Sequence, residues 1–168
     1  MVQGSVGFTC AGTRGLVDVN AIDAGKFETD APTPVGAKRR VLVGEFRDEV
    51  FADLEGLFAK LGYDVSRATF GGMVSSMVHD LRPNLVLVNE RFADQSGWLV
   101  ASKLQMFTIP PKVWLYACQL PSQVTIQKSV CGIEEVLSYR GILSLLHRQI
   151  LDRIALLQSV SDNEDSRV

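Results

Sequence analysis

Few residues of this 168-residue chain combine a reactive side chain with a position suited to chemistry. Asn89 is the most informative, because it ends an apolar run, residues 85–88, that follows a Pro83-Asn84 turn signal. This pattern predicts a strand covered on both faces, with Asn89 at its carboxyl end. An acyl phosphate forms on a carboxylate oxygen, and a carboxamide is not a nucleophile of that kind. The residue type therefore excludes phosphoryl transfer to position 89.

The other reactive side chains are scattered. His79 and His147 lie in separate predicted helices, without cysteine or carboxylate partners at ligand spacing, so we predict no metal site. The glycine pair Gly71-Gly72 lacks the motifs that cradle phosphates. Asp94 adjoins Ser96-Gly97, and this turn-favouring context indicates a loop residue. We therefore expect no cofactor and no enzymatic activity.

Composition narrows the class of protein further. A hydrophobic content of 46% is enough for a folded core, and a formal charge of −2 shows no basic surplus for direct nucleic-acid binding. No apolar run approaches the roughly 20 residues of a membrane span, and the first residues do not resemble a secretory signal. Three unpatterned cysteines suit a reducing compartment. We expect a cytoplasmic protein without membrane contacts.

The chain divides into three segments. Residues 1–38 contain several glycines and prolines without sustained periodicity, which predicts a flexible leader. Residues 158–168 are polar and acidic and are expected to form a frayed tail. Residues 39–157 hold the folded domain, and no second domain is expected after it.

Strand and helix patterns alternate through the predicted domain. β-rich runs predict strands at 41–43, 63–68, 85–88, 113–117 and 136–137. Helical periodicity and stop signals predict helices at 48–61, 72–81, 98–107, 122–131 and 142–157. Five strand–helix pairs in order indicate an open parallel sheet with helices on both faces. Met73, Met77 and Met106 are expected to fill the core.

The final predicted helix has a clear apolar stripe. One face carries the residues expected to reach the core: Leu143, Leu146, Ile150, Ile154 and Leu157. Leu145 and Leu156 fall roughly opposite that stripe. They are either ordinary exposed leucines or part of an interface.

This order of elements resembles the receiver domain of bacterial response regulators, of the chemotaxis-receiver type, over roughly residues 38–157. The resemblance is carried by the segments 41–45, 61–63, 83–89 and 132–137, together with Gly97. It implies a flavodoxin-like α/β fold, a three-layer sandwich of five βα units with the parallel strand order 2-1-3-4-5. It also implies a site beside the ends of the first and third strands.

The resemblance assigns a role to particular positions. A working receiver has two acidic residues after the first strand that help to hold Mg²⁺, and Glu45 and Phe46 stand there. Asn89 stands at the phosphoacceptor position. Tyr116 stands where the family uses threonine or serine, and Tyr139 where it uses lysine.

These replacements predict a degenerate pocket. Mg²⁺ prefers carboxylates and water as ligands, so Glu45 beside a neutral Asn89 is a poor magnesium site. The Phe46 ring would lie where a metal ligand and its waters belong. Without the lysine, no fixed cation is expected to balance a phosphoryl group. Tyr139 is neutral at cellular pH, because a phenol has a pKa of about 10. The chain is predicted to be a pseudo-receiver that is not phosphorylated in this pocket.

The family commonly uses the face formed by the fourth helix, fifth strand and fifth helix for contacts. On that basis the predicted partner or dimer interface contains Val136, which stands at the aromatic switch position, with Tyr139, Arg140, Leu145 and Leu156. Tyrosine and arginine are frequent at contact hot spots. The expected partner is a kinase, another regulator or a second copy.

The function predicted from the sequence is a non-catalytic interaction module in two-component-type signalling. Two alternatives remain open. One is an atypical response regulator phosphorylated at another residue. The other is a sensor of a small ligand with a flavodoxin-like fold.

Overall fold

The computed structural model describes the backbone of residues 38–165 and the side chains of residues 38–157. Within these residues, parallel strands form one sheet in the order β2-β1-β3-β4-β5. The strands are β1 (Arg40–Gly44), β2 (Asp64–Ala68), β3 (Leu85–Asn89), β4 (Val113–Ala117) and β5 (Glu135–Ser138). The predicted flavodoxin-like order is confirmed. The predicted leader, apart from Lys38, lies outside the described residues.

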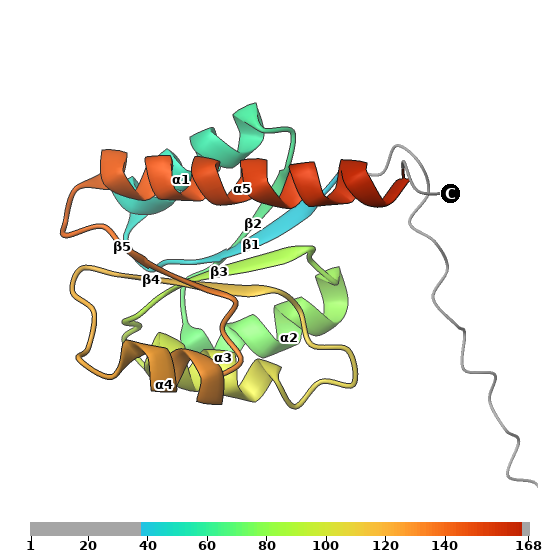
Figure 1. Ribbon diagram of the computed structural model, residues 1–168. Coiled ribbons are helices and arrows are strands. Elements are labelled where there is room, and N and C mark those ends of the chain that lie inside the picture. The colour runs from blue at the N-terminus through green and yellow to red at the C-terminus, as the bar shows by residue number, and fades with distance from the viewer. Residues whose placement is uncertain (1–37, 166–168) are drawn as a thin grey trace, which may run out of the picture. The chain divides into compact units, whose positions relative to one another are not determined.

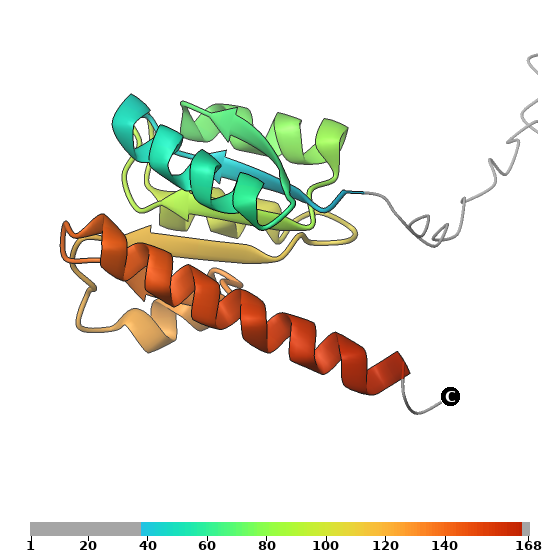
Figure 2. The ribbon, with the colours of Figure 1, turned by 90° about the horizontal axis from the view of Figure 1, so that it is seen from above.

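Helices cover both faces of this sheet. They are α1 (Asp48–Lys60), α2 (Gly71–Leu81), α3 (Gly97–Leu104), α4 (Val124–Val130) and α5 (Leu143–Asp165). Figure 1 shows α1 and α5 on one face and α2, α3 and α4 on the other. Figure 2 shows α1 and α5 in front of the strands when the domain is seen from above. No helix among the described residues is both long and apolar enough to span a membrane.

The ends of the helices follow local sequence signals where such signals exist. Gly62 and Gly132 follow α1 and α4 with φ angles of +80° and +62°, which glycine adopts without a Cβ clash. Helix α5 runs to Asp165, eight residues beyond the predicted end at 157. No proline or glycine interrupts that stretch, so most of the predicted tail continues the helix.

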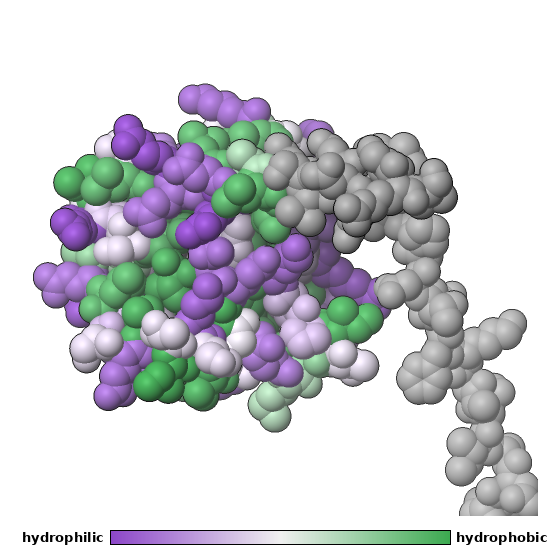
Figure 3. Space-filling model, in the orientation of Figure 1, coloured by the Kyte–Doolittle hydropathy of each residue, from purple (hydrophilic) through white to green (hydrophobic). Residues whose placement is uncertain are grey.

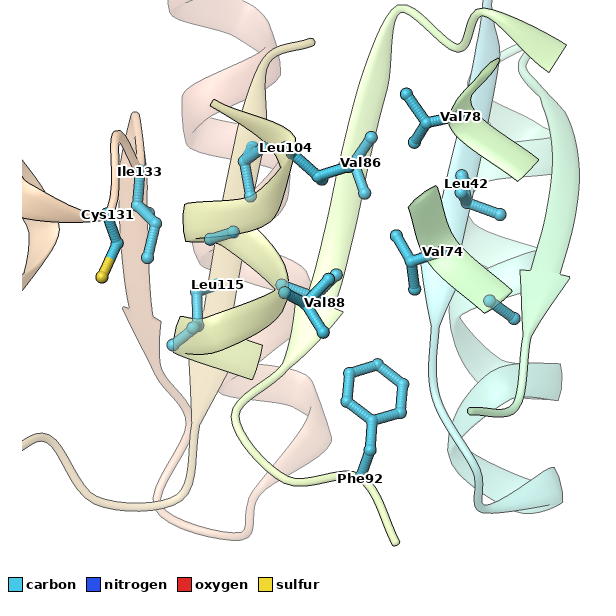
Figure 4. Packing of buried hydrophobic residues seen from close by; sticks show 14 of the residues in the cluster. Leu42, Val74, Val78, Val86, Val88, Phe92, Leu104, Leu115, Cys131 and Ile133 are labelled. Atoms are coloured by element: carbon cyan, nitrogen blue, oxygen red, sulfur yellow. The ribbon is translucent and has the colours of Figure 1, made fainter. Parts of the chain in front are cut away.

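Each sheet face has its own core. Between the sheet and α1 and α5, the predicted stripe of α5 is confirmed: Leu146, Ile150 and Ile154 are buried, and Leu143 and Leu157 pack against them. Figure 4 shows the opposite core, in which Val74 and Val78 of α2 lie over Leu42 and Val86 of the sheet. The sheet is therefore fixed from both sides, which holds the ends of its strands in place.

The methionines do not lie where the sequence analysis put them. Met73 is 44% exposed and Met106 is 86% exposed, and only Met77 packs against the core. In α2 the valines at 74 and 78 take the core positions, one residue along from the predicted stripe. The prediction that the three methionines fill the core is therefore wrong for two of them.

Candidate functional site

The carboxyl ends of β1, β3, β4 and β5 bring four of the predicted pocket residues together. Glu45 follows β1, Asn89 ends β3, Tyr116 lies in β4, and Tyr139 follows β5. Glu45 has no exposed surface and Asn89 is 6% exposed, and these are the buried polar side chains of the described domain. Buried polar groups need hydrogen-bond partners, so the contacts of this pair define the chemistry of the site.

The Asn89 carboxamide has a fixed orientation. Its Oδ1 accepts a hydrogen bond from the backbone N–H of Arg91 at 2.9 Å, and its Nδ2 donates to Glu45 Oε2 at 2.7 Å. The following loop is held close by Gly97, where an added Cβ would lie 2.1 Å from the Asn89 carbonyl oxygen. The amide therefore uses both of its ends to hold the loop and the neighbouring carboxylate.

The Glu45 carboxylate is saturated with donors. Its Oε2 also accepts from the Tyr116 hydroxyl at 2.5 Å and from Arg47 Nη2 at 2.8 Å. Its Oε1 accepts from the backbone N–H and Nε of Arg47, at 2.9 and 3.0 Å. Burial raises the pKa of Glu45, but the hydrogen bonds from Arg47, Tyr116 and Asn89 outweigh it and hold the pKa below its ordinary value. The carboxylate is thus ionised and fully occupied by protein donors.

Arg47 supplies the cation of the site, and the sequence analysis missed it. The guanidinium forms an ion pair with Glu45 at 2.8 Å and donates to the Tyr139 hydroxyl at 3.3 and 3.4 Å. The hydrogen bond to Glu45 raises the pKa of Arg47, so the charge is permanent. The pocket therefore contains a cation that the sequence analysis did not foresee, and this cation is paired with Glu45. Only the position of Arg47 two residues after Glu45 could have suggested it.

The two pocket tyrosines are internal. Their rings meet edge to face with centroids 5.9 Å apart, and neither Tyr116 nor Tyr139 exposes more than 6% of its surface. Burial and the nearby Glu45 charge raise the pKa of Tyr116 well above its ordinary value, so its hydroxyl stays protonated and donates. This burial corrects the prediction that Tyr139 is also a surface contact.

Phe46 lies at the rim rather than inside the site. Its side chain is 46% exposed, and its ring centroid is 5.5 Å from the Arg47 guanidinium carbon. Its carbonyl accepts from Arg67 Nη2 at 3.0 Å, which fixes the loop after β1. No group of three histidine, cysteine or carboxylate side chains is placed for metal binding within residues 38–157.

A hollow of about 780 Å³ opens above this network. That volume falls within the range of small-molecule pockets. It is lined by Phe46, Arg47, Asn89, Glu90, Arg91, Cys118, Gln119, Leu120, Pro121, Tyr139 and Gly141. Glu90 contributes the single carboxylate among these lining residues. The lining therefore combines apolar side chains with the guanidinium groups of Arg47 and Arg91.

Asp94 has a structural role. Its Oδ1 accepts from the backbone N–H of Gly71 at 2.9 Å and its Oδ2 from that of Gly72 at 2.8 Å. These bonds cap α2, whose own N-cap residue Phe70 makes no side-chain cap. The Gly72 hydrogen bond lowers the pKa of Asp94. Both carboxylate oxygens are thus engaged, as expected of a loop residue.

The predicted interface residues lie in different environments. Arg140 and Leu145 line a second hollow between the loop after β4 and the start of α5, whereas Val136 packs against the core. Leu156 is 55% exposed, eleven residues after Leu145 and therefore about 16 Å further along α5. The five predicted residues therefore do not form one patch.

No family model matches the sequence, and no curated protein matches it. Solved receiver domains are similar in structure. A CheY-like response regulator receiver domain protein from Methanospirillum hungatei has a TM-score of 0.65 and 15% identity, covering 76% of this chain and 99% of that chain. The signal receiver domain of an HD domain-containing protein from Pseudomonas fluorescens has a TM-score of 0.64 and 12% identity, covering 84% and 99%.

A chemotaxis response regulator from Vibrio cholerae gives a TM-score of 0.60 at 12% identity, covering 70% of this chain and 99% of that chain. These identities are low, but each comparison covers almost the whole of the solved domain. Together with the strand order 2-1-3-4-5, they show that the chain has the fold of response-regulator receiver domains.

Proposed function

From the receiver-domain fold, we propose that this chain is a non-catalytic pseudo-receiver, a regulatory interaction module of bacterial two-component-type signalling. It works in the cytoplasm through protein contacts and without aspartyl phosphorylation. The observation that carries the proposal is the closed network in which Asn89 and Arg47 both bind Glu45.

Three features of that network oppose phosphorylation at position 89. The Asn89 side chain offers no carboxylate oxygen to form an acyl phosphate. Glu45 is already paired with Arg47, so a divalent cation would have to displace a guanidinium held at 2.8 Å. The Tyr116 hydroxyl donates to Glu45 rather than facing an incoming group. A pocket that is satisfied internally has little affinity left for a phosphoryl group and its metal.

The contact surface is supported by the exposed side of α4. This helix has seven residues and buries none of them, while Ile126 and Val130 are 63% and 76% exposed. The two lie four residues apart and share a helix face. So short a helix is only marginally stable alone, and a partner that covers this face would stabilise it.

We infer that the second hollow, lined by Leu120 before α4 and by Arg140 and Leu145, belongs to the same contact surface. Arg140 has φ +50°, a left-handed conformation that is costly for a residue with a Cβ, and its side chain lines the hollow with Leu145. We therefore place the contact surface on Ile126, Val130, Arg140 and Leu145. Val136 and Tyr139 support it from inside the domain. The proposed partner is a kinase, another regulator or a second copy.

The proposal is tested by binding of a signalling partner to two variants. The double substitution Ile126→Glu and Val130→Glu is expected to abolish capture of that partner in a pull-down, with the circular dichroism spectrum unchanged. Leu99→Glu is the matched control, because Leu99 is 48% exposed on α3 and outside the proposed surface. Equal capture by the double variant and the wild type would contradict the proposed surface.

One observation favours a second candidate function, an atypical regulator phosphorylated elsewhere. Glu90 follows Asn89 directly and is one of the residues that line the first hollow. A phosphoryl adduct that forms on the wild type and disappears in Glu90→Gln would support this candidate over the pseudo-receiver.

A further inference from the structure

We propose that this chain joins copies of itself through a surface at the opposite end of the sheet, where a basic apolar edge binds the acidic outer face of α1 of a second copy. The edge is formed by Arg40, Arg82, Met106, Ile109 and Lys112. It consists of other residues than the contact surface proposed above. Gln105, next to Met106, bonds to Gly132 just after α4, so variants of the two surfaces are compared side by side.

The apolar part of the edge belongs to the loop between α3 and β4. Met106 is 86% exposed and Ile109 is 74% exposed, which places them among the most exposed large apolar residues of the described domain. Phe107 between them packs against the core and anchors the loop. The anchored backbone of this loop therefore keeps the Met106 and Ile109 side chains exposed to solvent. Figure 3 shows hydrophobic groups along the lower side of the domain, over α4 and the end of α3.

Cationic side chains accompany this loop. The backbone N–H of Asn84 donates to the Arg40 carbonyl, and that of Val86 donates to the Lys112 carbonyl, each at 2.8 Å. These bonds place the starts of β1, β3 and β4 side by side, with Arg82 just before β3. Arg40 and Arg82 form no ion pair within residues 38–157, and Lys112 lies 3.9 Å from Glu134. Two guanidinium groups of the edge therefore have no ion pair within residues 38–157, although Asp64 is the neighbour of Arg40 in the register of β1 and β2.

The outer face of α1 has the complementary character. Glu49 and Glu55 are exposed and form no ion pair with the described residues, while Asp48 is paired with Arg67 yet remains 88% exposed. Between the carboxylates lie exposed Ala52 and Gly56, and a Cβ built at Gly56 would meet no atom within 4 Å. The first two turns of this face are therefore acidic and open, whereas exposed Lys60 lies one turn beyond Gly56. The Met106 and Ile109 side chains can approach the backbone there closely.

The two surfaces cannot pair within one domain. Helix α1 covers one face of the sheet, whereas the loop that carries Met106 follows α3 on the other face (Figure 1). The contact must therefore join two copies through different patches, and such a heterologous contact adds copies in open chains or closed rings. Because exposed charges contribute to it, the association weakens as salt rises.

Sedimentation velocity over a concentration series tests the proposal. The wild type is expected to form larger species as its concentration rises at about 0.05 M salt, and to return to monomer at about 0.5 M salt. The edge variant carries Met106→Glu and Ile109→Glu, and the α1 variant carries Glu49→Lys and Glu55→Lys. Each is expected to be monomeric alone, whereas Leu99→Glu is expected to associate like the wild type.

Mixing the two variants gives the sharpest result. The edge variant keeps an intact α1 face and the α1 variant keeps an intact edge, so an equimolar mixture is expected to form one-to-one dimers that grow no further. A wild type that stays monomeric at all concentrations would overturn the proposal. So would association that survives both variants, or that is lost only with Ile126→Glu and Val130→Glu, which would assign self-association to the α4 surface.

Discussion

Asn89 donates its side-chain N–H to Glu45 at 2.7 Å, and this bond joins the ends of β3 and β1 inside the domain. The bond requires an amide, because a carboxylate at position 89 would have no proton to donate at neutral pH. Arg47 completes the arrangement by neutralising Glu45. The pocket thus contains an internal ion pair with a neutral amide bound to it. These interactions hold the ends of the strands together.

Asn89→Asp is expected to destabilise the domain. The new carboxylate would lie against Glu45, and repulsion between like charges would raise the pKa of the new side chain. The loss of unfolding free energy is therefore full at neutral pH. It disappears as the pH falls below the pKa of an aspartate in the unfolded chain, about 3.9. We expect a loss of about 2 kcal/mol at pH 7, measured by urea unfolding. A variant as stable as the wild type at pH 7 would contradict the assigned hydrogen bond.

Removing the internal cation is expected to cost more than removing a rim cation. Arg47→Ala leaves Glu45 buried without its counter-ion, and we expect a loss of about 2 kcal/mol, less than for a fully buried pair because Arg47 is partly exposed. Arg91→Ala is the control, since that exposed side chain forms no ion pair within residues 38–157. Equal unfolding midpoints for the two variants would argue against the network.

The stability of the wild type is expected to fall in acid partly through Glu45. Its pKa is lowered in the folded state, so its contribution is present above the ordinary value of 4.5 and is lost as the pH falls through the lower, folded pKa. Glu45→Gln removes this titration. The difference in unfolding free energy between wild type and variant should therefore be constant near neutrality and shrink below about pH 4.5. A difference that does not change with pH would show that Glu45 does not titrate in this way.

Asp94→Asn tests the structural role of the loop carboxylate. Its two oxygens accept from Gly71 and Gly72 at the start of α2, so the variant loses one acceptor and the charge that favours a helix N-terminus. The melting temperature is expected to fall by a few degrees, whereas Asp80→Asn on the exposed end of α2 should leave it unchanged. An unaltered melting temperature for Asp94→Asn would mean that the cap does not stabilise the helix.

Periodicity and turn residues predicted the five strands and the order of the helices, because those signals are local. The burial of Met73 was mispredicted, since α2 is apolar on more than one side and the valines one residue along compete for the core. Helix α5 was predicted too short, because no breaker marks its end.

The internal details of the site depend on contacts between distant segments. Arg47 reaches Tyr139 across 92 positions, and Asp94 caps a helix that begins 23 residues earlier. Neither contact leaves a local pattern, whereas an amide at position 89, where the resemblance to receiver domains implies a carboxylate, can be read from the sequence. Thus the residue types of the pocket could be predicted from the sequence, and their hydrogen-bond partners could not.

The most direct test of the central claim is intact-protein mass spectrometry after incubation with acetyl phosphate and Mg²⁺. A phosphorylatable receiver domain serves as the positive control, and Glu90→Gln is measured beside the wild type. The account predicts that the control gains a phosphoryl group while the wild type keeps its unmodified mass. A stoichiometric phosphoryl adduct on the wild type would contradict the account, and its loss in Glu90→Gln would identify the acceptor.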